Sequence, residues 1–304
     1  MNDMRDVFFD EILNIMRSDE HVIFLFADMG AMGLGQIRKE FPLRCVNVGI
    51  AEQNMANVAA GIALAGKKVI IYSIAAFATL RCYEQIKISI CGMGLPVAIV
   101  GMGPGISYAA DGPTHHATCD VASLGALSGM SILSPCDESS VRAAIREAYA
   151  STGPVYVRLD KGAYPALYSC NTLASMTQIC TGTQALIVAS GVLTHEALRA
   201  AKHLEQNGIS VGVVDVFRIK PFDYVALKNM STGVKLIVSI EEHVAWGGMS
   251  VQVAQALKNT GIYHEAMTLC EEQPIGYGDR AWYWRRYEID AAAITKRILS
   301  LISG

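Results

Sequence analysis

The sequence predicts an α/β protein with two consecutive open, mainly parallel sheets that carry helices on both faces. Short apolar runs rich in Val, Ile and Leu alternate with longer stretches of helical spacing, as expected for strands buried on both faces. The chain has 304 residues, which is enough for two domains of ordinary size. The alternation weakens between residues 160 and 183, where Gly, Pro, Ser, Thr and Asn accumulate.

The first half of the chain contains a regular series of strands and helices. The expected strands are short apolar runs, at 21–27, 44–48, 68–72, 97–101, 131–133 and 155–159. The expected helices have helical spacing of their apolar residues and lie at 10–17, 36–41, 51–65, 79–91 and 137–149. Gly66 is a plausible end for the third of these helices, because glycine readily adopts the left-handed conformation that closes a helix.

The second half of the chain repeats this alternation with fewer elements. Its expected strands lie at 185–189, 210–215 and 234–240, and its expected helices at 194–207, 248–259 and 289–302. We therefore place the boundary near residue 175, which gives one domain at 1–170 and another at 180–304.

The composition excludes several classes of protein. A hydrophobic fraction of 52% supports large cores and argues against disorder, and a net charge of -3 offers no basic surface for nucleic acid. The chain contains no long uncharged apolar run and no signal-peptide core, so we expect neither a membrane span nor secretion. Eight scattered cysteines without a C-x-x-C pair favour buried thiols in a reducing, cytoplasmic location and suggest no metal site.

Glu52 is the first candidate for chemistry. The strand at 44–48 ends before Gly49, and Glu52 then opens a helix of small residues. Open α/β sheets bind their ligands at such a junction. An acidic residue in the first helical turn is also favoured by the helix dipole alone, and a proton-donating role would need burial to raise the carboxyl pKa. The residue pattern leaves both interpretations open.

A second candidate is the long loop at 102–118, which is rich in Gly, Pro and Ala. Its segment Asp111-Gly-Pro-Thr-His-His116 places two histidines side by side, and histidine transfers protons near neutral pH. The alternative is a solvent-exposed turn without function. Lys161 follows a strand directly, where it could meet an anionic substrate or simply be solvated. From their pattern alone, Phe77 and Tyr83 are typical of core aromatic residues.

Four segments together resemble the transketolase family of thiamine-diphosphate enzymes. They are Gly49-Ile-Ala-Glu-Gln53, Phe77-Ala-Thr-Leu-Arg-Cys-Tyr-Glu-Gln-Ile86, Asp111-Gly-Pro-Thr-His115 and Gly153-Pro-Val-Tyr-Val-Arg-Leu159. Their order and spacing are most similar to the C-terminal subunit of two-chain transketolases, and 1-deoxyxylulose-phosphate synthases look similar. The resemblance spans nearly the whole chain and implies a pyrimidine-binding domain followed by a transketolase C-terminal domain.

The resemblance implies a set of cofactor-binding residues. Glu52 corresponds to the catalytic glutamate that hydrogen-bonds N1′ of the cofactor's aminopyrimidine. Phe77 corresponds to the aromatic residue that stacks on this ring. Asp28 and Met29 fall where the family has an acidic residue and an apolar support beneath the bent cofactor, and Arg81 lies in the same matching segment as Phe77.

The resemblance also implies a substrate site, with departures from the family pattern. His115 corresponds to a catalytic residue that contacts the substrate, as does Asp111. His116 replaces a usual glutamine, and Lys161 replaces a usual phosphate-binding arginine. Ala109-Ala110 replaces a usual Gly-Glu pair. Because a lysine cannot grip phosphate bidentately, we expect an unusual acceptor, such as an unphosphorylated or modified sugar or a carrier-bound thiol group.

A motif that the family requires is absent from this sequence. Relatives bind the diphosphate through Mg²⁺ with a Gly-Asp-Gly motif in a separate domain, and this chain contains no Gly-Asp-Gly. The resemblance therefore implies an N-terminal transketolase subunit as partner, which would hold Mg²⁺ and the diphosphate of thiamine diphosphate. It further implies a homodimer of this chain within an α2β2 complex.

The expected function is that of the catalytic subunit of a transketolase-like enzyme, which moves a two-carbon ketol unit from a ketose to an aldehyde or other acceptor. One alternative is a β subunit of a synthase or dehydrogenase that decarboxylates a 2-oxo acid, and Ala110 favours it. Another is a non-catalytic partner subunit, against which Glu52, Phe77 and His115 argue. We expect the C-terminal domain to serve packing and oligomerisation.

Overall fold

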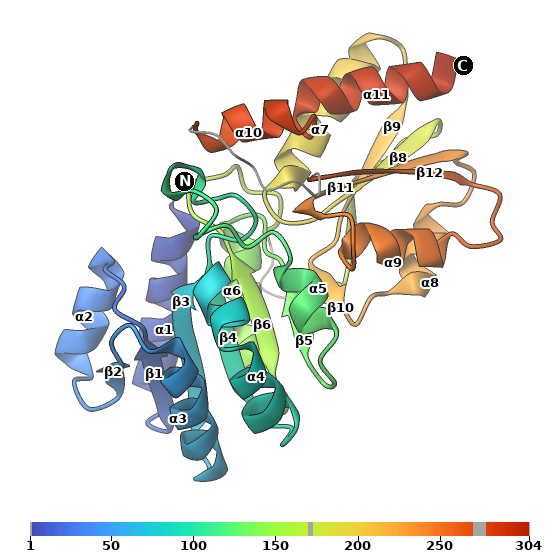
Figure 1. The fold of residues 1–304 in the computed structure, drawn as a ribbon. Coiled ribbons are helices and arrows are strands. Elements are labelled where there is room, and N and C mark those ends of the chain that lie inside the picture. Colours follow the sequence, from blue (N-terminus) through green and yellow to red (C-terminus); the bar gives the residue numbers. More distant parts are fainter. Residues whose placement is uncertain (1, 170–172, 270–277, 304) are drawn as a thin grey trace.

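The structure is a computed structural model that describes residues 2–169, 173–269 and 278–303, and it contains two sheets in series along the chain (Figure 1). In the described residues the first sheet has seven strands, in the order β10-β5-β6-β4-β3-β1-β2, and only β10 runs antiparallel to its neighbour. These strands are β1 (Val22–Phe26), β2 (Cys45–Asn47), β3 (Lys68–Ile74), β4 (Val97–Met102), β5 (Ser131–Leu133), β6 (Val155–Leu159) and β10 (Arg218–Lys220).

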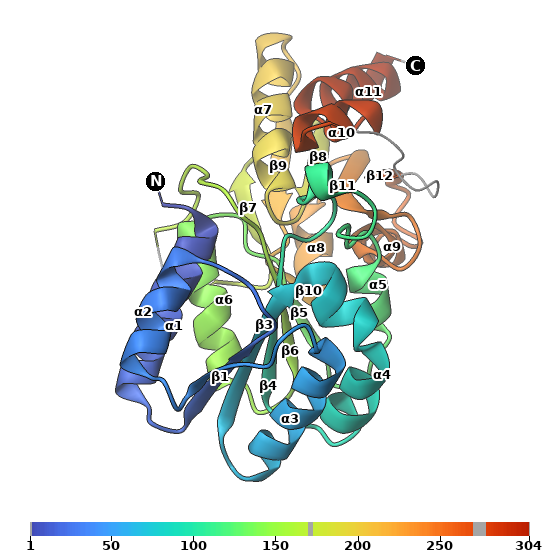
Figure 2. The same ribbon diagram turned by 60° about the vertical axis from the view of Figure 1, so that its left-hand side comes forward.

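Helices cover both faces of the first sheet. Figure 2 shows α1 and α6 on one face and α3, α4 and α5 on the other. The helical segments are α1 (Met4–Ser18), α2 (Met32–Glu40), α3 (Glu52–Leu64), η1 (Phe77–Arg81), α4 (Tyr83–Gln85), η2 (Ile86–Cys91), η3 (Ala109–Asp111), α5 (Asp120–Gly125) and α6 (Glu138–Ala150).

The second sheet has the order β12-β11-β8-β9-β7, and only β7 is antiparallel. Helices α7 and α11 pack together over one face, with α8 and α9 on the opposite face (Figure 1). These elements are β7 (Thr177–Cys180), β8 (Ala185–Ala189), α7 (Leu193–Gln206), β9 (Val211–Asp215), α8 (Tyr224–Met230), β11 (Leu236–Val244), α9 (Met249–Ala256), β12 (Tyr263–Leu269), α10 (Arg280–Arg286) and α11 (Ala291–Ser303). The predicted fold class is confirmed.

Local sequence explains where the predicted elements begin and end. Every residue of β4 and β8 is buried, as expected for Val- and Ile-rich strands inside a sheet that is covered on both faces. Gly66 follows α3 with φ +84°, the left-handed conformation that was expected there. Asp137 caps α6, because its side chain accepts the Ser140 backbone N–H while the Ser140 hydroxyl accepts the Asp137 N–H.

The helix expected at 79–91 differs from the prediction. It begins at Phe77 and consists of two π-helical turns, η1 and η2, around the short α4. The π-helix carries one more residue between hydrogen-bonded groups than the α-helix, so its side chains follow a wider period. Ile86 and Ile90 lie on the buried side of this segment, while Ile88 is 59% exposed.

The two halves of the chain are joined by shared apolar cores and by strand β10, and the first unit also contains a buried ion pair. Two apolar clusters each contain residues from both sheets, and β10 crosses from the second half to pair with β5. Inside the first unit, Arg158 Nε donates to Asp120 Oδ2 at 2.8 Å, and the Tyr156 hydroxyl donates to the same oxygen at 2.7 Å. Although burial opposes ionisation, the Arg158 charge keeps the pKa of Asp120 below its usual value.

Two sequence expectations of a general kind can be compared with the structure. Six of the cysteines lie in the described residues, and all six are free thiols that are buried or half-buried, as expected. Cys170 and Cys270 lie outside the described residues. In the described part of the chain, no helix combines the length and the apolar character that crossing a bilayer requires.

We predict that Arg158→Met destabilises the protein by about 3–5 kcal/mol, because it leaves the Asp120 carboxylate buried without a counter-charge. The midpoint of urea unfolding, followed by circular dichroism, measures the loss. Arg17→Met is the matched control, because Arg17 pairs with Glu40 at the surface and should change the midpoint little. Equal midpoints for the two variants would contradict this prediction.

Candidate functional site

The candidate residues gather at one edge of the first sheet. Strands β1, β2, β3, β4 and β6 are parallel, so their carboxyl ends share an edge. The residues follow these strands in turn, at Asp28 after β1, Glu52 after β2, Phe77 after β3, His115 in the loop after β4 and Lys161 after β6. Ligands of open parallel sheets bind at this edge.

Glu52 is buried, with only 2% of its surface exposed. Its Oε2 accepts a hydrogen bond from Arg81 Nη1 at 2.8 Å, and its Oε1 accepts one from the Ser73 hydroxyl at 3.3 Å. The side chain does not cap α3, whose first turn has no side-chain cap. Its partners come instead from β3 and from the π-helix η1, so the structure does not support a helix-capping role for this carboxylate.

Arg81 connects Glu52 to Phe77. The Arg81 guanidinium carbon lies 3.8 Å from the centre of the Phe77 ring, within the range of a cation–π contact. Both residues belong to η1, whose wide turn brings them to the same side. A planar, hydrogen-bonding group therefore touches the buried carboxylate and the aromatic face at once.

His115 and Lys161 extend this group of contacts. The imidazole of His115 lies 5.1 Å from the Phe77 ring and 6.0 Å from the Tyr108 ring, measured between centroids. Its Nδ1 lies 3.0 Å from the Thr114 hydroxyl. Lys161 Nζ lies 4.0 Å from the centre of the Tyr108 ring. The structure thus joins a carboxylate, an aromatic face, an imidazole and an ammonium group in one continuous site.

His116 lies outside this chain of contacts. It is buried, and its ring lies perpendicular to the ring of Tyr283 from α10, with the ring centroids 5.7 Å apart. Burial lowers the pKa of this imidazole. The two adjacent histidines therefore differ, because His115 faces the site and His116 packs beneath the loop.

Three other predicted residues lie at the margin of the site. Asp28 is exposed with φ 41°, and its carboxylate and backbone N–H both hydrogen-bond with the side chain of Asn47. Met29 is half-buried against the core, and Asp111 is exposed at the end of η3. Among the described residues, no hydrogen bond or ion pair joins these three to Glu52.

Sequence reasoning missed Ser73, Tyr108 and Tyr283. Ser73 could have been found, because it is the hydroxyl residue near the end of an apolar strand, on the element that precedes Phe77. Tyr108 lies in the predicted functional loop but belongs to no motif. Tyr283 is 167 positions from His116, so no local pattern could connect them.

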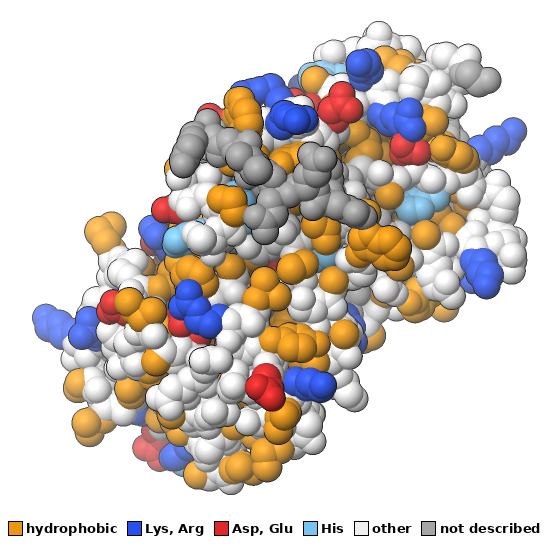
Figure 3. Space-filling model, in the orientation of Figure 1, with side chains coloured by type: hydrophobic (Ala, Val, Ile, Leu, Met, Phe, Trp, Pro, Cys, Tyr) orange, Lys and Arg blue, Asp and Glu red, His pale blue; other side chains and the backbone are white. Residues whose placement is uncertain are grey.

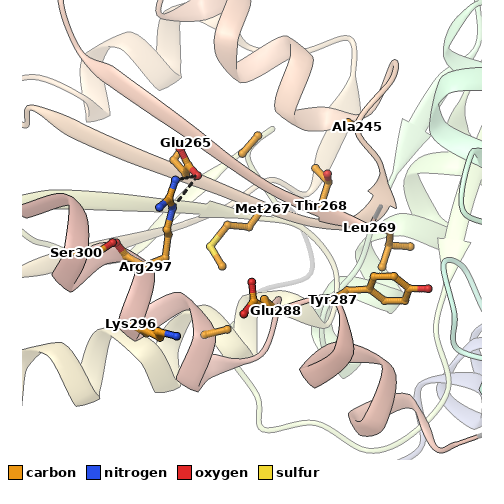
Figure 4. A pocket seen from close by; sticks show the side chains of 12 residues that line it. Ala245, Glu265, Met267, Thr268, Leu269, Tyr287, Glu288, Lys296, Arg297 and Ser300 are labelled. Atoms are coloured by element: carbon orange, nitrogen blue, oxygen red, sulfur yellow. Dashed lines mark hydrogen bonds and ion pairs between the residues drawn. The ribbon is translucent and has the colours of Figure 1, made fainter. Parts of the chain in front are cut away.

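A separate cavity of about 550 Å³ lies in the second half of the chain, between β12 and α11. Figure 4 shows Glu265 joined to Arg297 across it, with Lys296 and Ser300 on the helix. None of the predicted site residues lines this cavity. It therefore contributes nothing to the site at the sheet edge.

Comparison with known families identifies this arrangement. Residues 1–166 match the family described as "Transketolase, pyrimidine binding domain", and residues 175–272 match "Transketolase, C-terminal domain". The chain belongs to the transketolase family. Membership in this family implies dependence on thiamine diphosphate.

Two curated relatives and one solved structure are similar to this transketolase-family chain. One of the subunits of the apulose-4-phosphate transketolase of Phocaeicola vulgatus is 31% identical over 98% of this chain and 97% of its own length. The 6-deoxy-6-sulfo-D-fructose transketolase subunit SqwH of Clostridium sp. is 34% identical over 84% and 80%. The structure described as "Split gene transketolase, inactive beta4 tetramer" superposes with a TM-score of 0.88 at 29% identity, over 99% and 98%.

The residues at the sheet edge fit the aminopyrimidine half of thiamine diphosphate. Such a ring needs an acid at its edge and an aromatic side chain at its face. Glu52 and Phe77 provide both, and the Arg81 guanidinium demonstrates that one planar hydrogen-bonding group can contact them together.

We predict that His116 stays neutral at a pH where an ordinary histidine is half protonated, because burial lowers its pKa from the usual 6.5. The folded-state value lies below the unfolded one, so His116 contributes stability above pH 6.5 that is lost as the pH falls toward the folded value. Two-dimensional NMR of the imidazole signals measures this pKa, and His116→Gln assigns the signal. A midpoint at or above 6.5 would contradict the prediction.

Proposed function

We propose that this chain is the catalytic subunit of a two-component, thiamine-diphosphate-dependent enzyme. It moves a two-carbon ketol unit from a ketose to an aldehyde or other acceptor. The observation that carries this proposal is the buried Glu52 carboxylate, which Arg81 links to the face of Phe77 at the carboxyl edge of a parallel sheet. The names of the two curated relatives support a transketolase reaction.

The chain's own residues bind and orient the cofactor. Thiamine diphosphate, when bound, supplies the electron sink on which ketol transfer depends. Glu52 hydrogen-bonds the pyrimidine nitrogen and holds a proton there, while Phe77 stacks on the ring. When the pyrimidine ring binds, Arg81 moves away from Glu52 and Phe77 and remains beside the ring. Asp28 and Met29 support the cofactor from the neighbouring strand end.

The loop after β4 and the residue after β6 bind the substrate. His115 lies against Phe77 and is placed to exchange a proton with a substrate oxygen, and the exposed Asp111 is available to sugar hydroxyls. Lys161 presents a cation at the margin of the site. The names of the two relatives describe a phosphate ester and a sulfo-sugar, both anionic. We assign the anionic end of the donor to Lys161, and to His116 a supporting position beneath the loop.

A separate subunit completes the site. Because the chain lacks the Gly-Asp-Gly motif, the partner holds Mg²⁺ and the diphosphate. Apolar side chains are exposed around α3 and the π-helices, at Ile50, Val58, Leu64, Leu80 and Ile88. Figure 3 shows hydrophobic side chains distributed over this face of the first unit, with few charged ones between them. Such a face suits a dimer of this chain inside an α2β2 complex.

We expect the purified chain to turn over no donor when it is supplied with thiamine diphosphate and Mg²⁺ alone. A partner subunit that carries the Gly-Asp-Gly motif should restore transfer, because it supplies the diphosphate half of the site. The assay is a panel of phosphorylated, sulfonated and neutral ketoses, with pyruvate as the test for the decarboxylating alternative. Turnover by the lone chain would refute the two-component proposal, and turnover of pyruvate alone would replace ketol transfer with decarboxylation.

In the reconstituted complex, Glu52→Gln should lower kcat by roughly 10²–10⁴-fold, the range that a positioned proton-transfer group contributes. Glutamine has nearly the same shape and can still accept from Arg81, so assembly should persist, and size-exclusion chromatography checks this. Glu20→Gln, in the exposed turn that precedes β1 and away from the carboxyl edge of the sheet, is the matched control and should keep full activity. If Glu52→Gln is as active as Glu20→Gln, Glu52 is not catalytic.

A further inference from the structure

The loop that carries Tyr108, His115 and His116 is closed at its base. Gly105 N donates to Ala117 O at 3.1 Å, and Ala117 N donates to Gly105 O at 2.7 Å. These two bonds fix the two ends of the loop to each other. The position of His115 therefore depends on what holds this base.

The base of the loop rests on a carboxylate of the second sheet. Ile106 N donates to Oε1 of Glu242, on β11, at 3.3 Å. Gly105 lies so close to this side chain that an added Cβ would be 2.7 Å from Glu242 Cγ. One residue further, the Ser107 hydroxyl donates to Asp160 Oδ1 at 2.8 Å. Two carboxylates thus hold the start of the loop, and neither belongs to the loop itself.

A single guanidinium forms ion pairs with both carboxylates. Asp160 and Glu242 have side chains that are only 3% and 6% exposed. Arg280, the first residue of α10, donates through Nη1 and Nη2 to the two Asp160 oxygens at 2.8 and 2.7 Å and through Nε to Glu242 Oε1 at 3.0 Å. Its Nη2 also contacts Glu242 Oε2. The planar fork of arginine makes this double grip possible, and a lysine could not reproduce it.

The same arginine reaches the site by two further routes. Asp160 Oδ1 accepts the backbone N–H of Lys161 at 2.8 Å, so the residue that presents the site's ammonium group is tied to the same ion cluster. Tyr283, one turn after Arg280 on α10, meets the ring of His116 at 5.7 Å. Helix α10 therefore contacts the loop directly at His116 and is linked to the start of the loop through Glu242 and Asp160.

We propose that Arg280 is a positioning residue for the transfer reaction. By pairing with Asp160 and Glu242, it fixes the loop base and Lys161 and so sets His115 against Phe77. It contacts no member of the site directly. The inference rests on the proposed function for its kinetic consequence, but the placement of the loop does not depend on that function. The C-terminal half of the chain then contributes to the reaction as well as to packing.

The first test measures the loop without any assay of activity. Diethyl pyrocarbonate modifies accessible imidazoles, and mass spectrometry of the modified full chain gives the rate at each histidine. In the wild type His116 should be protected. In Arg280→Met it should become reactive, while the buried His195 and His243 in the second half stay protected. Arg286→Met, on the exposed last turn of the same helix, is the matched control and should leave all rates unchanged.

The second test uses the reconstituted complex and the best donor of the panel. Arg280→Met should lower kcat/KM by up to about a hundredfold, because misplacement of substrate-positioning groups by about an ångström has an effect of that size. The loss should appear mainly in KM, since Lys161 and the loop bind substrate, and Arg280→Lys should recover only part of it. Arg286→Met should behave as the wild type.

The two tests together separate a positioning role of Arg280 from a purely structural one. Unchanged His116 protection in Arg280→Met overturns the inference, whether or not the enzyme is active. Exposure of His195 and His243 together with His116 also overturns it, because Arg280 would then only hold the fold. A wild-type complex that turns over no donor refutes the proposed function instead, and the modification pattern still reports on the loop. Exposure of His116 alone, with a raised KM, supports the inference.

Discussion

A buried carboxylate loses its hydration and must be compensated by protein groups. At Glu52 this requirement organises the surrounding structure. Ionised, it needs hydrogen-bond donors or a counter-charge nearby. The donors come from two elements, the Ser73 hydroxyl from β3 and the Arg81 guanidinium from η1. Arg81 can reach because the first helical segment after β3 is π-helical and so differs in side-chain direction from an α-helix. The irregular helix, the stacked Phe77 and the burial of Glu52 are therefore one connected feature.

The same requirement applies to other buried carboxylates, within the first unit and between the two halves of the chain. Arg158 compensates Asp120 within the first unit, and Arg280 compensates one carboxylate from each unit, Asp160 and Glu242. Such pairs contribute less to stability than their Coulomb attraction suggests, because both partners lose their hydration. They do fix geometry, since a misaligned pair leaves a charge unpaired. The apolar clusters bring the two sheets together, and the ion clusters define the relative position of the loop after β4.

Much of the fold followed from the sequence, because strands such as β4 and β8 are uninterrupted apolar runs and α6 carries its own cap. Glu52 and Phe77 were found through their motifs, and the structure places their side chains in contact with the same arginine. What escaped prediction depends on distant partners. Strand β10 has only three residues and exists through its pairing with β5, and β12 mixes polar and apolar residues without a regular alternation at a sheet edge. Arg280 meets Asp160 across 120 positions, a relation that no local pattern encodes.

Because Arg81 lies over the Phe77 ring, a ligand that binds there replaces the Arg81 guanidinium. A ring that hydrogen-bonds with Glu52 Oε2 and stacks on the Phe77 face beside Arg81 competes with a guanidinium that already contacts both residues. That guanidinium is a tethered competitor, whose effective concentration is set by the chain and does not fall on dilution. Since 40% of the Arg81 side chain is exposed, it regains hydration readily when it leaves. The net affinity of this face for a ligand is therefore the difference between the ligand's contact with Glu52 and the Arg81 contact that the ligand replaces.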